Sequence, residues 1–263
     1  MTEPHQDAAS ILTRDGMDAS PNEPQTVLVA GASGGIGAAL CVQLVQQFPT
    51  IRLIRLARQP ESLAELSVET LDLAFDLDCE DSLTALAEAI PDSWSPDWLL
   101  LATGWLHNET FMPEKSWRQL DQAHLMQALQ RNTIGPVLLL QQLFHQHAAK
   151  QPLKVGVLSA RVGSISDNRL GGWHAYRASK AALNMLLKNF AIEFNRQRRP
   201  WIIVGLQPGT TATALSAPFQ RNVPADQLQT PEYTASQLIK VMQALQPVDS
   251  GELFDFLGLR FAP

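Results

Sequence analysis

The chain has 263 residues, of which 45% are hydrophobic, and its formal net charge is −6 with a pI near 5.5. This length and apolar content suit one domain with a sizeable core. The acidic balance and the lack of a Lys- and Arg-rich stripe argue against a nucleic-acid partner. No apolar run reaches the roughly 20 residues that cross a bilayer, so we expect no membrane association.

The first 24 residues are rich in Pro, Asp, Asn and Ser and lack the basic and apolar regions of a secretory signal. This composition predicts a disordered tail over residues 1–24, followed by one domain over residues 25–263. The two cysteines, Cys41 and Cys79, stand far apart in no metal-binding or disulfide pattern. Such cysteine usage favours a soluble protein of the reducing cytoplasm.

After the tail, apolar runs typical of buried parallel strands alternate with segments that have the 3.6-residue period of helices. Strands are expected over residues 26–31, 51–57, 71–77, 97–103, 154–160, 201–207 and 252–257. Helices are expected over residues 36–47, 81–90, 117–149 and 178–195. This order predicts an α/β fold of the Rossmann type, a doubly wound parallel sheet of about seven strands with helices on both faces. Ligands then bind at the carboxyl ends of the strands.

The first strand leads into a glycine-rich turn and then into a helix. The turn reads Gly31-Ala-Ser33-Gly34-Gly35-Ile36-Gly37. Glycines permit a tight turn, and they let the backbone approach a pyrophosphate at the N-terminus of the helix. The spacing fits both GxxxGxG and GxxGxxG, so it predicts a dinucleotide site without choosing between these two branches.

The end of the second strand indicates which dinucleotide binds. An acidic residue there would accept hydrogen bonds from the adenosine ribose, but the stretch reads Arg55-Leu-Ala-Arg58-Gln, with no acid before Glu61. A guanidinium suits a 2′-phosphate. NADP(H) is therefore favoured, with Arg58 as the main contact, and NAD(H) is the alternative. Asp76, which we place at the end of the third strand, is expected near the adenine.

Tyr176 and Lys180 form a Tyr-x-x-x-Lys pattern at the start of the most regular helix. Residues i and i+4 share one helix face, so the phenol and the ammonium can point into one pocket. A free tyrosine has a pKa near 10, and a neighbouring ammonium favours the phenolate. We expect Lys180 to lower the pKa of Tyr176 for acid–base catalysis and to reach the nicotinamide ribose.

Together, the glycine turn and the Tyr-x-x-x-Lys helix resemble the short-chain dehydrogenase/reductase family over nearly everything from Thr26 onward. The stretches Val-Leu-Ser-Ala-Arg-Val-Gly-Ser-Ile and Gly-Gly-Trp-His-Ala-Tyr-Arg-Ala-Ser-Lys are most similar to the C-factor and sniffer-type carbonyl reductases. The resemblance implies a proton-relay asparagine at Asn132 and a loop with Pro208, Gly209 and Thr213 at the nicotinamide end. It also implies a homodimer or homotetramer.

Two positions depart from the family pattern. The fourth strand, usually followed by Asn-Asn-Ala-Gly, here ends in Leu-Ala-Thr103-Gly104, which we still expect at the cofactor. The carbonyl-orienting serine is normally the second of a Ser-Ser pair, whereas this pair reads Ser159-Ala160. Ser164 is favoured over Ser159 for that role because its distance from the tyrosine is closer to the usual separation.

These residues predict an enzyme that transfers a hydride between a nicotinamide cofactor and a small-molecule carbonyl or alcohol, with Tyr176 as the acid–base group. The six histidines are isolated or face different directions, so no metal is expected. The rival hypothesis is an NAD(P)-binding sensor or signalling protein with little or no turnover. Ala160 and the signalling role attached to C-factor relatives motivate this rival.

Overall fold

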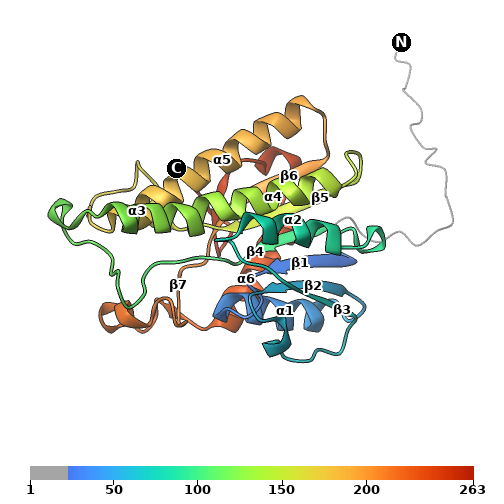
Figure 1. Cartoon of the computed structure of the whole chain (residues 1–263), viewed down its shortest axis with the longest axis horizontal. Helices are drawn as coiled ribbons and strands as arrows, with labels where there is room; N and C mark the ends of the chain where they lie inside the picture. Colours follow the sequence, from blue (N-terminus) through green and yellow to red (C-terminus); the bar gives the residue numbers. More distant parts are fainter. Residues whose placement is uncertain (1–22) are drawn as a thin grey trace, which may run out of the picture.

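All seven predicted strands lie in one central sheet (Figure 1). The computed structural model describes residues 23–263, so most of the predicted tail lies outside the described residues. Within them, the sheet has the order β10-β9-β6-β5-β4-β1-β2-β3 and is parallel except for the pair of β9 and β10. The strands are β1 (Thr26–Ala30), β2 (Arg52–Ala57), β3 (Thr70–Ala74), β4 (Trp98–Leu101), β5 (Leu153–Leu158), β6 (Trp201–Gln207), β9 (Leu253–Asp255) and β10 (Arg260–Phe261).

The sheet has helices on both faces because each buried strand is apolar on both sides. On β1, Val27 and Val29 face a core shared with helices α1 (Gly35–Gln47) and α6 (Pro231–Ala244). Leu28 and Ala30 face the opposite core, which is shared with α2 (Glu80–Ala89), α4 (Gly135–Gln146) and α5 (His174–Arg196). In Figure 1, α2, α4 and α5 stand in the upper part of the picture, and α1 and α6 in the lower part. The doubly wound architecture predicted from the sequence is confirmed.

The predicted helix over residues 117–149 is three helical segments and a short 3₁₀ turn. The turn covers Trp117–Gln119, α3 covers Gln122–Leu129, a π-helical turn covers Gln130–Ile134, and α4 follows. Gly135 begins α4 where a Cβ atom would lie 2.7 Å from Leu77 Cβ, so the chain comes unusually close to the turn after β3. A single π-helical turn often marks a functional site, and this one carries Asn132.

Two predicted boundaries differ at functional residues. Helix α5 begins at His174 rather than at residue 178, which places Tyr176 inside its first turn. Strand β3 ends at Ala74, so Asp76 lies beyond the strand rather than at its end. The Asp76 backbone N–H donates to Ser82 Oγ, so the chain has already left the sheet for α2.

Strand β1 lies between β2 and β4, and the chain runs outward from β1 in both directions. A crevice forms at such a switch point, outside the carboxyl ends of the strands. The glycine turn after β1 and the segment after β4 meet there, since a Cβ atom on Gly31 would lie 3.1 Å from Ala102 O. A small parallel pair, β7 (Thr210–Thr211) and β8 (Leu228–Gln229), follows β6 at the same end. Among residues 23–263, no helix is long and apolar enough to span a membrane.

Candidate active site

The turn after β1 is built so that only glycines fit at its two ends. Gly31 has φ +82°, a left-handed conformation that favours glycine. A Cβ atom on Gly37 would lie 2.0 Å from Gly31 O, so a larger residue there would push the turn away from α1. Gly34, the N-cap of α1, provides no side-chain cap. The first N–H groups of α1 therefore stay available for an anion, as a pyrophosphate site requires.

A cavity of about 220 Å³ lies beside this turn. Its wall includes seven of the residues predicted to bind the cofactor, namely Gly31, Ser33, Gly34, Arg58, Asp76, Thr103 and Gly104. Gly35 and Gly37 form the start of α1 behind this wall, and Ile36 lines the neighbouring cavity described below. The structure thus brings the ends of β1, β2 and β4 and the turn after β3 to one site that suits a dinucleotide.

The two arginines near the end of β2 differ in their availability. Arg55 is buried and binds both carboxylate oxygens of Asp72, at 2.7 and 2.5 Å, so its guanidinium is already neutralised. Arg58 is exposed, lines the cavity, and makes no hydrogen bond or ion pair with another described residue. Only Arg58 of this pair has a free guanidinium to offer a phosphate.

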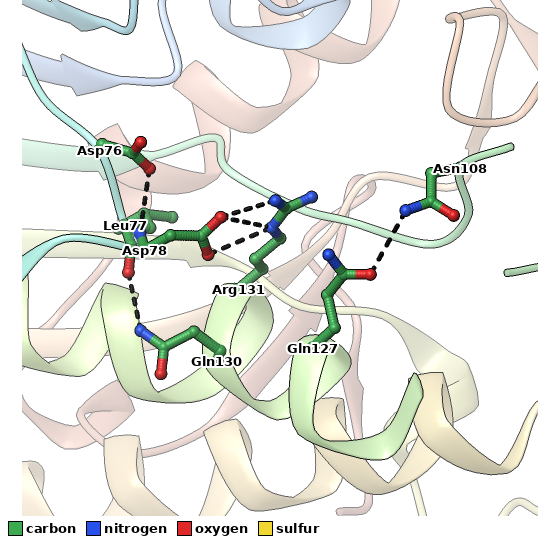
Figure 2. Close-up of polar contacts among 7 residues, drawn as sticks. All are labelled: Asp76, Leu77, Asp78, Asn108, Gln127, Gln130 and Arg131. Atoms are coloured by element: carbon green, nitrogen blue, oxygen red, sulfur yellow. Dashed lines mark hydrogen bonds and ion pairs between the residues drawn. The ribbon is translucent and has the colours of Figure 1, made fainter. Parts of the chain in front are cut away.

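One side of this cavity, where the adenine is expected, is held by polar contacts between the turn after β3 and the π-helical turn (Figure 2). Asp76 Oδ1 accepts a hydrogen bond from the Asp78 backbone N–H at 3.0 Å, and Asp78 forms an ion pair with Arg131 at 2.6 Å. Gln130 Nε2 donates to Leu77 O at 2.8 Å. Asp78 and Arg131 also line the cavity, and the sequence did not single them out as site residues.

A second cavity, of about 320 Å³, holds Tyr176 in its wall. It also includes residues predicted for the nicotinamide end and the reaction, namely Ile36, Ser159, Pro208, Gly209 and Thr213. Trp173 and Phe219 form an aromatic side of this cavity, with ring centroids 5.0 Å apart. Because Ile36 belongs to the glycine turn, both cavities meet that turn, and one extended ligand could occupy both.

Lys180 lies under Tyr176 and is almost fully buried. Its Nζ lies 5.9 Å from the centroid of the Tyr176 ring and donates to Leu158 O at 2.9 Å. Burial raises the pKa of Tyr176 to about 12 and lowers the pKa of Lys180 to about 8. The predicted lowering of the Tyr176 pKa is thus not seen in the protein chain alone, because desolvation outweighs the distant ammonium.

Asn132 ties the π-helical turn to the segment after β4 and to α5. Its Oδ1 accepts from the Trp105 backbone N–H at 2.7 Å, and its Nδ2 donates to Trp105 O at 2.8 Å. Nδ2 also lies 3.1 Å from Ser179 Oγ, on the residue before Lys180. Asn132 is therefore buried beside α5, and its contact there is to the residue before Lys180.

The two candidate serines are both engaged within the chain. Ser159 lines the Tyr176 cavity, but its Oγ donates to Asn184 Oδ1 at 2.6 Å. Ser164 does not line that cavity, and its Oγ accepts from the Asp167 backbone N–H at 3.1 Å. The preference for Ser164 drawn from sequence separation finds no support in this placement, because spacing does not report where a loop residue points.

Sequence reasoning missed Glu114, which caps the catalytic helix. The N-cap residue Trp173 provides no side-chain cap, and the Glu114 carboxylate accepts from the Ala175 backbone N–H at 3.2 and 3.3 Å. The backbone carbonyl of Glu114 accepts from the Trp173 backbone N–H, and its carboxylate pairs with His124, whose Nδ1 lies 3.3 Å from Oε1. Glu114 stands 61 residues before Ala175 in the sequence, so no local pattern marks it as a cap of α5. Only the fold reveals this role.

Replacing Glu114 is expected to loosen the first turn of α5. Glu114→Ala leaves the buried Ala175 N–H without an acceptor, which costs about 1–3 kcal/mol of unfolding free energy. Glu114→Gln keeps an acceptor and should recover most of that loss. Urea unfolding measures both, with Glu109→Ala, an exposed glutamate of the same loop, as the control. Equal stability of wild type and Glu114→Ala would show that the cap contributes nothing.

The fold and the cavity at the glycine turn fit a dinucleotide-binding oxidoreductase, and Tyr176 and Lys180 lie at the second cavity. The sequence matches the family model for short chain dehydrogenase over residues 25–224. The chain therefore belongs to the short-chain dehydrogenase/reductase family and is a nicotinamide-dependent oxidoreductase, as its sequence predicted.

Several similar proteins are named as dehydrogenases or reductases. The chain is 29% identical over 227 residues to 1-hydroxy-2-glutathionyl-2-methyl-3-butene dehydrogenase of Rhodococcus sp. (strain AD45), covering 86% of this chain and 94% of the relative. It is 24% identical over 243 residues to a Bacillus subtilis benzil reductase ((S)-benzoin forming), covering 87% and 96%. An NADPH-bound carbonyl reductase from chicken fatty liver shares the fold, with a TM-score of 0.75, 22% identity, and coverage of 91% and 99%.

Proposed function

We propose that this protein is an NADPH-dependent carbonyl reductase. The observation that carries the proposal is the position of Tyr176 in the wall of a cavity that meets the glycine turn. A carbonyl compound in that cavity would have a proton donor on one side and the cofactor site on the other. Such positioning converts a reaction between separate molecules into one within a single complex.

The cofactor site fits NADP(H) on this chain's own features. The free N–H groups at the start of α1 and the close approach of Gly37 to Gly31 would accommodate a pyrophosphate. Pro208, Gly209 and Thr213 would line the nicotinamide end. When bound, NADPH supplies the hydride that the protein cannot supply.

Tyr176 would donate the proton to the substrate oxygen. A tyrosine phenol is protonated at neutral pH, and burial adds to this because it raises the pKa of Tyr176 to about 12. Lys180, which extends under the tyrosine ring, would favour the phenolate left after transfer. We assign Asn132 to proton resupply as a positioning residue, because it holds the backbone of Trp105 beside Ser179.

Arg58 would determine the choice of NADPH over NADH. Arg58→Ala should raise the Kd for NADPH about tenfold or more, because hydrogen bonds to a charged group contribute about 1.5–3 kcal/mol. The Kd for NADH, which lacks the 2′-phosphate, should change by less than about twofold. Fluorescence titration of both cofactors against wild type and the variant measures this. A parallel loss for both cofactors would assign Arg58 to general structure instead.

The substrate is proposed to be an aromatic carbonyl compound. Trp173 and Phe219 provide two aromatic faces in the Tyr176 cavity, and Leu106, Leu215 and Val223 add aliphatic ones. A related protein is named for benzil, a compound with two aromatic rings. The test is NADPH consumption over a panel of aldehydes, ketones and quinones that includes benzil. Tight NADPH binding with no turnover on the whole panel would favour the sensor hypothesis.

Self-association remains a prediction of this proposal. Helices α3 and α5 expose Met126, Met185 and Ile192, whose side chains are 61%, 62% and 49% accessible. Covering such apolar side chains is a common reason for subunit contact. Sedimentation velocity would distinguish the monomer from the expected homodimer or homotetramer.

A cytoplasmic location likewise remains an expectation from cysteine usage.

A further inference from the structure

A methyl group stands in the wall of the Tyr176 cavity where a second hydrogen-bond donor could stand. Ala160 and Tyr176 both line this cavity. Ser159, next to Ala160, directs its hydroxyl to Asn184, and Ser164 lies outside the cavity wall. The Ser159 proton is therefore already donated, and the Ser164 hydroxyl does not reach this cavity.

Several other polar residues of this cavity make contacts within the chain. Ser216 Oγ donates to Thr211 O, and Thr211 Oγ1 lies 2.9 Å from Thr234 Oγ1. Thr213 packs on the glycine turn, because a Cβ atom on Gly35 would lie 2.6 Å from its Cγ2 atom. Arg161 forms an ion pair with Asp167 at 2.8 Å. The serine hydroxyls of this wall, Ser159 and Ser216, thus donate within the chain, and Tyr176 contributes its phenol to the same wall.

The number of donors matters because carbonyl reduction places negative charge on oxygen. The carbonyl carbon gains a hydride from NADPH, the C=O π bond breaks, and the oxygen takes the Tyr176 proton to give an alcohol and NADP⁺. Loss of one donor to such an oxygen costs about 10²–10³ in rate. A substrate whose own electron-withdrawing group disperses this charge needs the missing donor less.

We propose that the replacement of a donor by Ala160 restricts this enzyme to activated carbonyl compounds, chiefly aromatic diketones and quinones. This inference rests on the proposed function and adds a specificity-determining position to it. The second carbonyl of a diketone withdraws electrons from the first and lowers the barrier to hydride attack. Trp173 and Phe219 would hold the aromatic ring of such a substrate, with Trp173 6.3 Å from the Tyr176 ring.

The test uses benzil and deoxybenzoin, which have the same two rings but differ in one carbonyl. Wild type should reduce benzil with a kcat/KM at least about 10³ times that for deoxybenzoin. Ala160→Ser adds a hydroxyl at the cavity wall and should raise kcat/KM for deoxybenzoin about 10- to 100-fold, with benzil changed less than about threefold. Ala160→Cys introduces a side chain similar in size to serine, but its thiol is a weak donor. This variant should leave the ratio of kcat/KM for benzil to kcat/KM for deoxybenzoin near that of wild type.

Three results would overturn the inference. Wild type could reduce deoxybenzoin at more than about a tenth of the benzil value. Ala160→Ser could change the ratio of the two kcat/KM values, benzil over deoxybenzoin, by less than about threefold. Ala160→Cys could lower this ratio as much as Ala160→Ser does, which would assign the effect to side-chain volume. Absence of NADPH consumption with either compound, in wild type and in Ala160→Ser alike, would remove the proposed function as well. Turnover with an unchanged ratio removes only the inference.

Discussion

Tyr176→Phe is expected to lower kcat for benzil about 10³-fold while the Kd for NADPH changes by less than about threefold. A positioned general acid typically contributes 10²–10⁴ in rate, and Tyr176, which lines the second cavity, is the acid in the proposed function. The substitution removes one oxygen and leaves the ring that packs near Trp173. Steady-state kinetics with saturating NADPH and a separate fluorescence titration give the two quantities.

The matched control is Tyr233→Phe, because the chain has two tyrosines. Tyr233 lies on α6, is 45% exposed, and contacts Phe256 through its ring, so loss of its hydroxyl should leave kcat unchanged. If Tyr176→Phe retained more than about a tenth of wild-type kcat, another group would be the acid. If NADPH binding fell in parallel with kcat, the phenol would serve cofactor binding instead.

The Tyr233→Phe variant also isolates the protonation state of Tyr176. Its remaining phenol can be titrated by the absorbance of tyrosinate. Since burial raises the pKa of Tyr176 to about 12, no phenolate should form at neutral pH in the cofactor-free protein. A protonated phenol is ready to donate, which favours the reductive direction. A titration midpoint below about 10 would indicate instead that Lys180 dominates the environment, as the sequence pattern predicts.

The fold and the cofactor loop were predictable because their signals are local. Strands β1 and β6 are apolar on both faces, and this pattern requires cover on both sides. Gly31 and Gly37 are needed by one turn of seven residues, so a short stretch of sequence contains the whole constraint. Tyr176 and Lys180 share one helix, and their spacing alone brings them to one face.

The finer parts of the site were not predictable because they join distant segments. Glu114 reaches Ala175 only after the segment following β4 has folded against α5. Asp72 of β3 pairs with Arg55. Only the fold therefore shows that Arg58, and not Arg55, is free to bind a phosphate. Ser164 follows a 3₁₀ turn, Arg161–Gly163, that begins a loop. The number of residues between Ser164 and Tyr176 does not show which path this loop takes.

Lys180→Met is expected to abolish turnover and yet to unfold at no lower urea concentration than wild type at pH about 7. Burial lowers the pKa of Lys180 from 10.5 to about 8, so its charge costs the folded state about 3 kcal/mol at neutral pH. Methionine removes that cost. It also leaves Leu158 O without its donor, which costs about 1–3 kcal/mol, so the net change should be near zero or a gain of up to about 2 kcal/mol.

The pH dependence tests the cause of this effect. Between about pH 8 and 10.5 the unfolded chain keeps the Lys180 proton while the folded chain has lost it, so wild-type stability gains from this group as pH rises. The stability of Lys180→Met relative to wild type should therefore fall by about 2 kcal/mol from pH about 7 to about 9.5, so that wild type becomes at least as stable as the variant. Cys41 and Tyr176, whose pKa values burial raises to about 12, act with the opposite sign but are common to both proteins. A difference that stays constant with pH would mean that Lys180 keeps its charge without cost, and that the lysine contributes to stability as well as to turnover.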